Sequence, residues 1–403
     1  MESWITPSSL AILRVLVALA PLPDLSQFVH QLATPLTAFP RLKEGVFLYK
    51  NAINPYSGGP FRHSPIQLLL FSTILPTGPL APLLWAAADI LGAWCLVQIF
   101  RIRGGSIDAS RERQIALFYL FNPYTFLSTT ALSTSTFDNA LYMLAVLFAC
   151  KRRPAASMLA LAVLTTSSLT SLLLLPPLAL LLISSPKSGL LYPQPFTAKL
   201  QSTVPVVARY FAYLVALAAV STLVVGDWSW VARTWGATLT LPDVTPNPGL
   251  WWYFFTEMFD HFRPFFLMVF SVHLIAYVAP ICLKFQHDPL FATVVLQGLF
   301  ATFKAYPSLA DPGLFVNTIA IFPEVFPYLR HPVVTTMLHL YSSLLLVLFH
   351  NLWLVQGTGN ANFYYASTMV FGLANGFAVT DLIWAGLRAA FGRIPDGWEV
   401  TQT

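Results

Sequence analysis

The sequence predicts an all-α polytopic membrane protein, and its composition and its hydropathy pattern are the two observations that predict this class. Of the 403 residues, 56% are hydrophobic and only 10% are charged. An average soluble domain has about 25% charged residues, and so little charge cannot cover the surface of a soluble protein of this length. The composition therefore excludes an ordinary cytosolic enzyme, a disordered chain and a nucleic-acid-binding protein.

Twelve apolar runs are long enough, or nearly so, to cross a bilayer, since a spanning helix needs about 20 residues. They lie at about 5–22, 78–100, 114–130, 135–150, 155–168, 169–184, 204–226, 264–284, 289–303, 313–329, 333–355 and 363–388. The runs at 155–168 and 169–184 meet at a junction rich in serine and threonine, which fits a broken or re-entrant pair as well as two full spans. We predict one membrane domain over residues 1–403, with about 12 transmembrane helices.

Basic residues predict the orientation of this bundle. Four arginines lie in the loop at about 101–113, and two lysines lie in the loop at about 185–203. With 12 spans, both loops fall on the side that also holds both termini, and the positive-inside rule makes this side cytosolic. The longer loops at about 23–77 and 227–263 then lie on the opposite side, although the first of them is itself basic.

The sequence shows no convincing catalytic or metal-binding constellation. Cys95, Cys150 and Cys282 lie in or at the ends of apolar runs, whereas a nucleophilic thiolate needs an exposed or electropositive setting. CxxC and HExxH motifs are absent from the sequence, so we expect neither a metal nor a cofactor. Glu257 and His261 are spaced i, i+4 and would share one helix face; a contact at the membrane edge explains them better than an acid–base pair.

Three carboxylates fall at membrane depth, at Asp89, Asp138 and Asp381. A charge there is expensive unless it is paired or hydrated, so each is a candidate site residue. For Asp89 and Asp381, hydrogen bonding between helices is the better explanation. Asp138 follows the serines and threonines of 133–136 and precedes Asn139, and for this cluster a binding role and a helix contact are both open.

Asparagines mark two further places. Asn360 and Asn362 lie between a glycine-rich turn and the aromatic start of the last apolar run. Amide side chains offer donors and acceptors that suit a polar head group, and a helix N-cap explains one asparagine better than two. Asn122 precedes Pro123 in an otherwise apolar run, where a kink would line a cavity.

The loops at about 23–77 and 227–263 are rich in proline and glycine, which fix the backbone, and long loops of this kind are usually functional. The second loop carries an aromatic run typical of the membrane–water interface: Trp251, Trp252, Tyr253, Phe254 and Phe255. Lys304 and Asp311 share one short turn, where we expect a salt bridge between them. We expect structural or partner-contact roles for seven loop residues: Asn54, Pro55, Tyr56, Asn247, Glu257, His261 and Asp311.

Five stretches carry a family resemblance. The longest is PDVTPNPGLWWYFFTEMFDHF at 242–262, and four more follow the same order at 35–65, 117–134, 303–311 and 359–366. Together they resemble the PIG-U family, the multi-spanning subunit of glycosylphosphatidylinositol (GPI) transamidase in the endoplasmic reticulum membrane. The resemblance spans most of the chain.

The resemblance implies a non-catalytic subunit that works with other subunits, among them one that holds the cysteine-protease site. It also implies contact with the GPI lipid and with the C-terminal signal of the precursor protein, a polar spacer followed by a hydrophobic tail. On this basis we expect GPI lipid or head-group contacts at ten residues: Asn360, Asn362, Asn122, Asp138, Asn139, Trp251, Trp252, Tyr253, Phe254 and Phe255.

A wider resemblance provides the alternative. Glu44-Gly45, Asn54-Pro55-Tyr56 and the segment at 62–65 are similar to the first lumenal loop of GPI mannosyltransferases, GT-C enzymes that use a dolichol-phosphate sugar donor. Those enzymes carry an acidic motif shortly before the Glu-Gly pair, but residues 25–43 contain no Asp or Glu. We therefore expect a GT-C-like arrangement that has lost glycosyl transfer. A transporter or scramblase would predict an inverted repeat, and none is visible.

Overall fold

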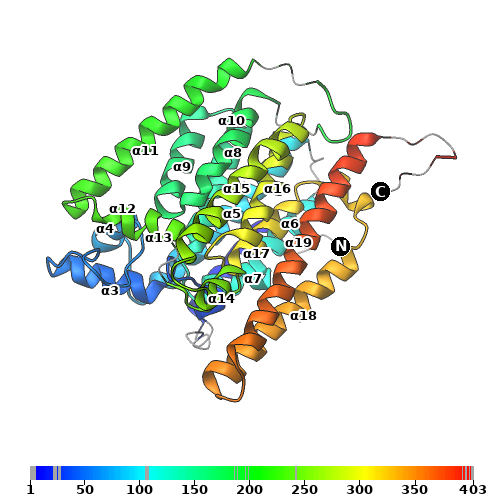
Figure 1. Ribbon diagram of the computed structural model, residues 1–403. Coiled ribbons are helices and arrows are strands. Elements are labelled where there is room, and N and C mark those ends of the chain that lie inside the picture. Colours follow the sequence, from blue (N-terminus) through cyan, green and yellow to red (C-terminus); the bar gives the residue numbers. More distant parts are fainter. Residues whose placement is uncertain are drawn as a thin grey trace.

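Figure 1 shows a computed structural model of the chain, which describes residues 6–400 apart from 21–24, 26–28, 105–108, 186, 188, 196, 198, 241–242, 393, 395–396 and 399. Within these residues the chain forms helices, turns and loops, and no strand. Pro242, the first residue of the longest family-like stretch, lies outside the described residues.

The helices follow one another through the whole chain. The first part holds α1 (Pro7–Leu19), α2 (Val29–Leu32), α3 (Phe39–Lys50), α4 (Pro65–Thr73), α5 (Ala81–Arg103), α6 (Ala109–Phe121), α7 (Pro123–Thr130), α8 (Ser135–Cys150), α9 (Pro154–Ser167) and α10 (Leu175–Ile183). The second part holds α11 (Val204–Val225), α12 (Ser229–Arg233), α13 (Trp235–Thr240), α14 (Trp251–Glu257), α15 (Arg263–Lys284), α16 (Pro289–Phe303), α17 (Ala310–Ile319), α18 (Pro332–His350) and α19 (Ala361–Phe391).

Each of the twelve predicted apolar runs overlaps a helix, so the all-α class is confirmed. Among the residues that the structure describes, five helical segments are long and apolar enough to cross a membrane by themselves: Ala81–Arg103, Leu200–Val225, Arg263–Lys284, Pro332–Val355 and Ala361–Phe391. Five more apolar segments have 10–17 residues: Pro7–Leu19, Ser135–Cys150, Pro154–Ser167, Leu169–Ile183 and Pro289–Phe303. The chain has the helices of a membrane protein.

One predicted run, at 114–130, is broken inside, and a second break falls at the expected junction between the runs 155–168 and 169–184. Pro123 cannot donate a backbone N–H, so it begins α7 and ends α6, and the Asn122 side chain caps the new helix by accepting from Tyr124 N at 3.0 Å. The second break falls at Ser168, which is extended (φ −134°, ψ 98°) and separates α9 from a 3₁₀ turn that leads into α10.

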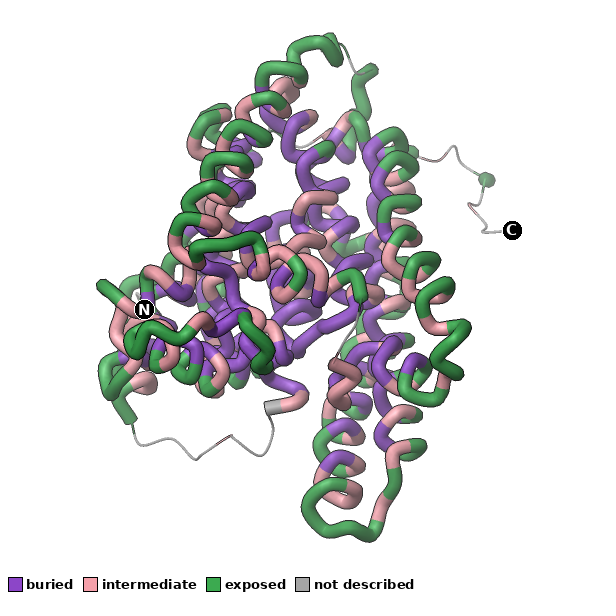
Figure 2. Tube along the Cα trace, turned by 60° about the vertical axis from the view of Figure 1, so that its left-hand side comes forward, coloured by how far each residue is buried: buried purple, intermediate pink, exposed green. Residues whose placement is uncertain are grey.

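The core lies between α5, α8, α9, α16 and α17, and α11, α15 and α18 lie outside it. Figure 2 shows buried residues through the centre and exposed residues on the outer helices. α11, α15 and α18 expose large apolar side chains such as Leu223, Met268 and Leu344. In a membrane protein such faces meet lipid or partner helices, so the outer ring is the surface on which such contacts are made.

Two of the carboxylates at membrane depth join helices, as predicted for them. Asp89 on α5 forms an ion pair with Arg14 on α1 at 2.8 Å. Asp381 on α19 accepts the backbone N–H groups of Arg330 at 2.8 Å and His331 at 3.2 Å, just before α18 begins. Both contacts satisfy charges that would otherwise be costly within the bundle.

Candidate functional site

The family-like stretches lie far apart in the sequence but meet at one end of the bundle. We call this the loop end, because it holds α2, α3, α14 and the turns that follow α7 and α16. Three hydrogen bonds join the five stretches in two groups: Thr134 N to Thr37 O at 2.9 Å in one, and Asp243 N to Tyr306 Oη at 3.3 Å and Tyr365 Oη to Leu250 O at 3.3 Å in the other. The ion pair between Arg41 and Asp243, at 3.1 Å, links the two groups. Leu309 N also donates to Gln31 O at 3.0 Å. The loop end is therefore one continuous structure, built from distant parts of the chain.

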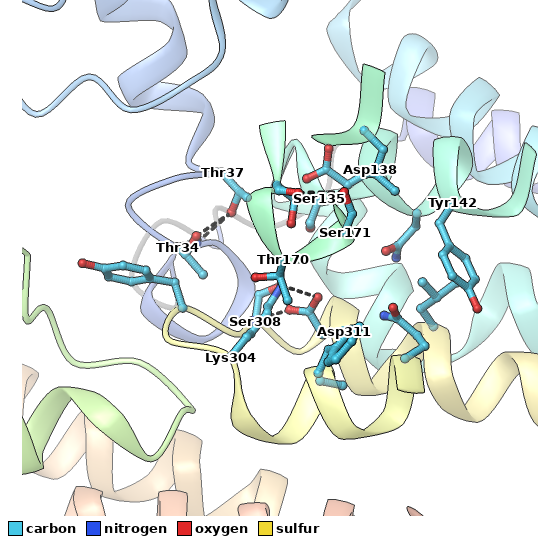
Figure 3. Close-up of a pocket in the computed structure, with 18 of the residues that line it drawn as sticks. Thr34, Thr37, Ser135, Asp138, Tyr142, Thr170, Ser171, Lys304, Ser308 and Asp311 are labelled. Carbon is cyan, nitrogen blue, oxygen red and sulfur yellow. Dashed lines mark hydrogen bonds and ion pairs between the residues drawn. The ribbon is translucent and has the colours of Figure 1, made fainter. Parts of the chain in front are cut away.

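A polar pocket opens at the loop end (Figure 3). Its cavity volume is about 60 Å³, and it is lined mainly by hydroxyl groups, amides and three charged side chains. The lining polar residues are Thr34, Thr37, Ser135, Asp138, Asn139, Tyr142, Ser168, Thr170, Ser171, Gln297, Lys304, Tyr306, Ser308 and Asp311. Two of the ten expected lipid contacts, Asp138 and Asn139, belong to this pocket.

The charges of the polar pocket are partly compensated inside the chain. Lys304 Nζ lies 2.5 Å from Asp311 Oδ1, which confirms the expected salt bridge. Asp311 Oδ2 also accepts from Ser308 N at 2.8 Å. Asp138 Oδ1 accepts from Ser167 Oγ at 2.6 Å, so a hydroxyl and not a cation holds this carboxyl group. The pocket is suited to neutral, hydroxyl-rich partners.

A second site at the loop end joins α14 to the start of α19. The Tyr253 hydroxyl donates to Asn362 Oδ1, and the Tyr253 ring stacks on Tyr365 with centroids 4.6 Å apart. Asn360 Oδ1 accepts from Phe363 N at 3.2 Å, so Asn360 is the N-cap of α19. The two asparagines thus have different roles, and only Asn362 meets the aromatic run. We call Tyr253, Phe254 and Asn362 the rim site.

The aromatic run divides into buried and accessible members. Trp251, Trp252 and Phe255 are 3%, 2% and 0% exposed, and they pack inside the chain. Phe254 is 40% exposed, and Tyr253 is half-buried. A lipid or partner that reaches this run therefore meets Tyr253 and Phe254.

Asn122 and Asn139 form hydrogen bonds to α17 inside the bundle. Asn122 Nδ2 donates to Asn317 Oδ1 at 2.8 Å, which ties α17 to the break between α6 and α7. Asn139 Nδ2 donates to Ala310 O at 3.4 Å, at the start of α17. The structure therefore does not gather the ten residues into one site, and Asn122 lies in neither the polar pocket nor the rim site.

The expectation that Glu257 and His261 share one helix face is wrong. α14 ends at Glu257, and the next residue, Met258, is extended (φ −79°, ψ 134°). Arg263 caps the end of this helix: its Nε donates to Phe255 O and its Nη2 to Met258 O, both at 3.1 Å. His261 therefore lies beyond the helix.

The loop asparagines stabilise their own turns. Asn54 Oδ1 accepts from Tyr56 N at 2.8 Å, and Asn247 Oδ1 accepts from Gly249 N at 2.8 Å. A hydrogen bond from the backbone N–H of a residue to the asparagine side chain two positions earlier stabilises a turn. A Cβ atom at Gly249 would lie 2.6 Å from Pro307, so this turn packs tightly on the turn after α16.

Two titratable groups at the loop end, His63 and Asp243, have shifted pKa values. Burial lowers the pKa of His63 to about 4, although its Nε2 lies 3.1 Å from Ala38 O. Burial acts to raise the pKa of Asp243, but hydrogen bonds from Thr245 and the charge of Arg41, 3.1 Å away, outweigh it and lower this pKa. The Arg41–Asp243 pair joins α3 to the segment that leads into α14.

Sequence reasoning missed several polar groups at the loop end. Gln31, His350 and Tyr364 are at most 2% exposed, and their side-chain N and O atoms include five with no hydrogen-bond partner among the described residues. Tyr142 has the same property in the polar pocket. A lone polar group in an apolar run is the signal that could have identified His350 and Tyr142.

The cysteines and the acidic residues that the structure describes lie apart from one another or inside the fold. Cys95, Cys150 and Cys282 are all buried, and within the described ranges no group of three His, Cys, Asp or Glu side chains could hold a metal ion. The loop end carries a polar pocket and an aromatic rim.

Comparison with known proteins agrees with this picture. The model of the family described as GPI transamidase subunit PIG-U matches residues 8–371. The chain is similar to the GPI transamidase component GAB1 of Saccharomyces cerevisiae, with 32% identity over 377 residues that cover 92% of this chain and 91% of the yeast protein. It is also similar to the GPI-anchor transamidase component PIGU of Homo sapiens, with 29% identity over 403 residues covering 91% and 90% of the two chains. A GAB1 homolog of Schizosaccharomyces pombe is 31% identical over 368 residues, covering 88% and 86%.

Proposed function

The chain belongs to the PIG-U family of GPI transamidase subunits, and from this premise we propose that it works in that complex as a non-catalytic, lipid-recognising component. The chemistry of transfer is assigned to another subunit, which holds a cysteine-protease site. Burial of Cys95, Cys150 and Cys282 supports this assignment, because a buried thiol in apolar surroundings is unreactive.

The observation that carries the lipid-recognising role is the contact between Tyr253 and Asn362. It places an amide, a phenol and the exposed Phe254 ring at one edge of the loop end. An amide and a phenol can hydrogen-bond a phosphorylated or glycosylated head group, and an exposed aromatic ring at a membrane interface packs against acyl chains or a partner helix. We assign the rim site to the GPI lipid or to the hydrophobic tail of the precursor's signal.

The membrane setting is part of the proposal. We place the loop end in the lumen of the endoplasmic reticulum and both termini in the cytosol, with about 12 spans in a GT-C-like arrangement. The four arginines at 101–113, which lie at the end of α5 and the start of α6, support this orientation. The apolar faces of α11, α15 and α18 would then be covered by lipid and by other transamidase subunits.

The alternative of an active mannosyltransferase is not favoured. The three relatives named above are transamidase components, and the segment before Glu44 lacks the acidic residues that such an enzyme needs.

Two experiments test the proposal. In cells depleted of this protein, complete GPI bearing ethanolamine phosphate should accumulate while precursor proteins stay unprocessed. Accumulation of an under-mannosylated intermediate would instead identify a glycosyltransferase.

The second experiment tests the rim site in depleted cells that express variants. Asn362→Ala and Tyr253→Phe should lower the amount of GPI-anchored protein at the cell surface while the other subunits still co-purify. Tyr192→Phe, at an exposed tyrosine far along the chain, is the matched control and should change neither readout. If Asn362→Ala leaves GPI attachment intact, the head-group assignment is wrong; if it abolishes co-purification, the rim site is an assembly contact.

A further inference from the structure

An apolar furrow follows α5 and α8 on the outside of the bundle. The starts of the two helices are joined, since Trp85 Nε1 donates to Ser133 O at 2.7 Å, and α8 then packs between α5 and α9 (Figure 1). A cavity of about 370 Å³ lies over the two helices, and α4 and α9 contribute to its walls. The side chains that line it from α5 and α8 are hydrocarbon: Leu84, Ala87, Ala88, Leu91, Phe137, Ala140, Leu141 and Leu144.

Exposed side chains of α5 continue the furrow beyond the cavity. Ala87 is exposed, Leu91 is 36% exposed and Trp94 is 48% exposed. Residues three or four apart lie on one face of a helix, so these three form one strip with Leu84. From Leu84 to Trp94 the strip is about 15 Å long at a rise of 1.5 Å per residue, which is about half the thickness of the hydrocarbon core of a bilayer. The strip therefore matches an acyl chain in one leaflet.

α8 shows the same spacing and ends in a cation. Leu144 and Phe148 are half-buried and one turn apart, and the exposed Lys151 follows at the end of the helix. Lys151 Nζ lies 5.4 Å from the centroid of the Trp94 ring, so a cation and an aromatic ring meet where the two strips end. Tryptophan and lysine side chains favour the membrane–water interface. This end of the furrow is therefore placed at the depth of lipid head groups.

Positive charge gathers at this end. Three exposed cations follow one another there, and we call them the basic corner: Lys151, Arg152 and Arg153. None of the three forms an ion pair with a residue that the structure describes. Arg152 Nη2 donates at 2.9 Å to Ser184 O, a neutral acceptor that leaves the charge uncompensated. Glu112, an acidic residue near the end of α5, is already engaged by Arg101 at 2.6 Å. The basic corner is therefore suited to an anion from outside the chain.

The opposite end of the furrow has no such attraction for an anion. The polar residues that line the cavity there are uncharged: Ser64, Gln67, Thr166 and Ser167. The Ser167 hydroxyl is already used, since it donates to Asp138 at 2.6 Å. A lipid with a negatively charged head group therefore fits the furrow in one direction only, with its head group at the basic corner.

We propose that the furrow and the basic corner bind one anionic glycerophospholipid of the surrounding bilayer, with its head group beside Lys151 and an acyl chain along α5 and α8. Basic clusters at the cytoplasmic ends of transmembrane helices attract the anionic phospholipids of that leaflet. The inference goes beyond the proposed function. It concerns a resident bilayer lipid whose head group lies at the opposite end of the bundle from the rim site, and it uses only the membrane setting of that proposal.

The test uses the purified transamidase complex in phosphatidylcholine nanodiscs. The probe is phosphatidylserine with a diazirine in one acyl chain, and a second set of discs carries the same diazirine chain on phosphatidylcholine. After illumination, the phosphatidylserine probe should label peptides of α5 and α8 at least about 5-fold more than the phosphatidylcholine probe, the ratio for one basic residue near the head group. Unlabelled phosphatidylserine should compete with this labelling, and added phosphatidylcholine should not.

Two variants with matched controls locate the site. Lys151→Gln should lower labelling by the phosphatidylserine probe about 5-fold. Lys284→Gln, at an exposed lysine in the last turn of α15, should leave it unchanged. Ala87→Leu narrows the furrow and should reduce labelling by both probes, whereas Ala276→Leu, exposed on α15, should not.

The proposal is overturned if the two probes label α5 and α8 equally, if these helices are not labelled because another subunit covers them, or if Lys151→Gln behaves like Lys284→Gln. The competition experiment on the unsubstituted complex decides the matter even where a variant fails to assemble. The GPI profile of depleted cells tests the transamidase role separately. Accumulation of complete GPI without selective labelling of the furrow would therefore reject the phospholipid site alone.

Discussion

Arg14 and Asp89 form an ion pair at 2.8 Å in which the two side chains are 2% and 6% exposed. The pair joins α1 to α5, and Phe126 covers the guanidinium, with its ring centroid 4.8 Å from Cζ. Neither charge has access to water, so each depends on the other.

We predict that Asp89→Asn destabilises the protein strongly, because it leaves the Arg14 charge buried without its counter-charge. Removing one partner of a buried pair costs about 3–5 kcal/mol. The measurement is the thermal unfolding of the purified complex, together with the steady-state level in cells. Asp260→Asn is the control, since Asp260 pairs with Arg263 but is 90% exposed; such a surface pair contributes about 0–1 kcal/mol. Equal effects of the two substitutions would contradict the buried role of Asp89.

Two tyrosines offer a paired test of hydrogen bonding at the loop end. The Tyr56 hydroxyl donates to His63 O at 2.8 Å, whereas the Tyr364 hydroxyl has no hydrogen-bond partner among the described residues. We expect Tyr56→Phe to cost about 1 kcal/mol and Tyr364→Phe to be neutral or stabilising, because the latter removes an unsatisfied buried group. Thermal unfolding of the two variants checks this. A large loss for Tyr364→Phe would show that a ligand or ordered water satisfies this hydroxyl in the complex.

The sequence predicts contacts between near neighbours better than contacts between distant segments. The salt bridge between Lys304 and Asp311 follows from their spacing in one turn, and a helix-joining role for Asp89 follows from the cost of a charge at membrane depth. In contrast, Asn122 meets Asn317 across 195 positions, and no local pattern identifies that partner. Asn362, Tyr253 and Asp138 were predicted as contact residues from the sequence, but the pairing of Asn362 with Tyr253 and of Asp138 with Ser167 could be assigned only from the packing of α14 and α9.

The end of α14 shows why the prediction that Glu257 and His261 share one helix face failed. Spacing alone places Glu257 and His261 on one face, provided that the helix continues. Arg263 binds the carbonyl groups at the helix end instead, and this contact depends on the return of the chain into α15. Helix ends that are set by a side chain from outside the helix are not visible in a local pattern.

The stability of the folded protein should decrease as the pH is lowered, because His63 is buried in its neutral form. Its pKa is lowered to about 4 in the folded protein, against about 6.5 in an unfolded chain. Its contribution is therefore fully present above pH 6.5 and is lost as the pH falls from about 6.5 to about 4, where the unfolded chain binds a proton that the folded protein does not. The loss amounts to about 3 kcal/mol at 1.36 kcal/mol per pKa unit.

The measurement for His63 is the unfolding temperature of the complex between pH 7 and pH 4, compared with His63→Gln. The glutamine can still donate to Ala38 O but does not titrate, so the variant should show a weaker decline. His261→Gln, at an exposed position, should follow the unsubstituted protein. Asp243 acts at lower pH, since its pKa is lowered from 3.8 and its contribution is lost only as the pH falls below that value. Parallel curves for His63→Gln and the unsubstituted protein would contradict the assignment.

Close packing of α16 against α17 and α19 depends on Gly298. A Cβ atom there would lie 2.6 Å from the Phe315 ring and 2.7 Å from Val379, closer than real side chains approach. We expect Gly298→Ala to cost about 1–3 kcal/mol, since overpacking forces neighbouring side chains or helices to move. Gly376 on α19 is the matched control, because a Cβ atom there meets nothing within 4 Å. Gly376→Ala should be neutral or stabilise by up to about 1 kcal/mol, since alanine favours the helix. Thermal unfolding of both variants decides the matter: a stable Gly298→Ala variant would mean that α16 can move away from its neighbours, and the packing that supports the polar pocket through Gln297 would then be looser than described.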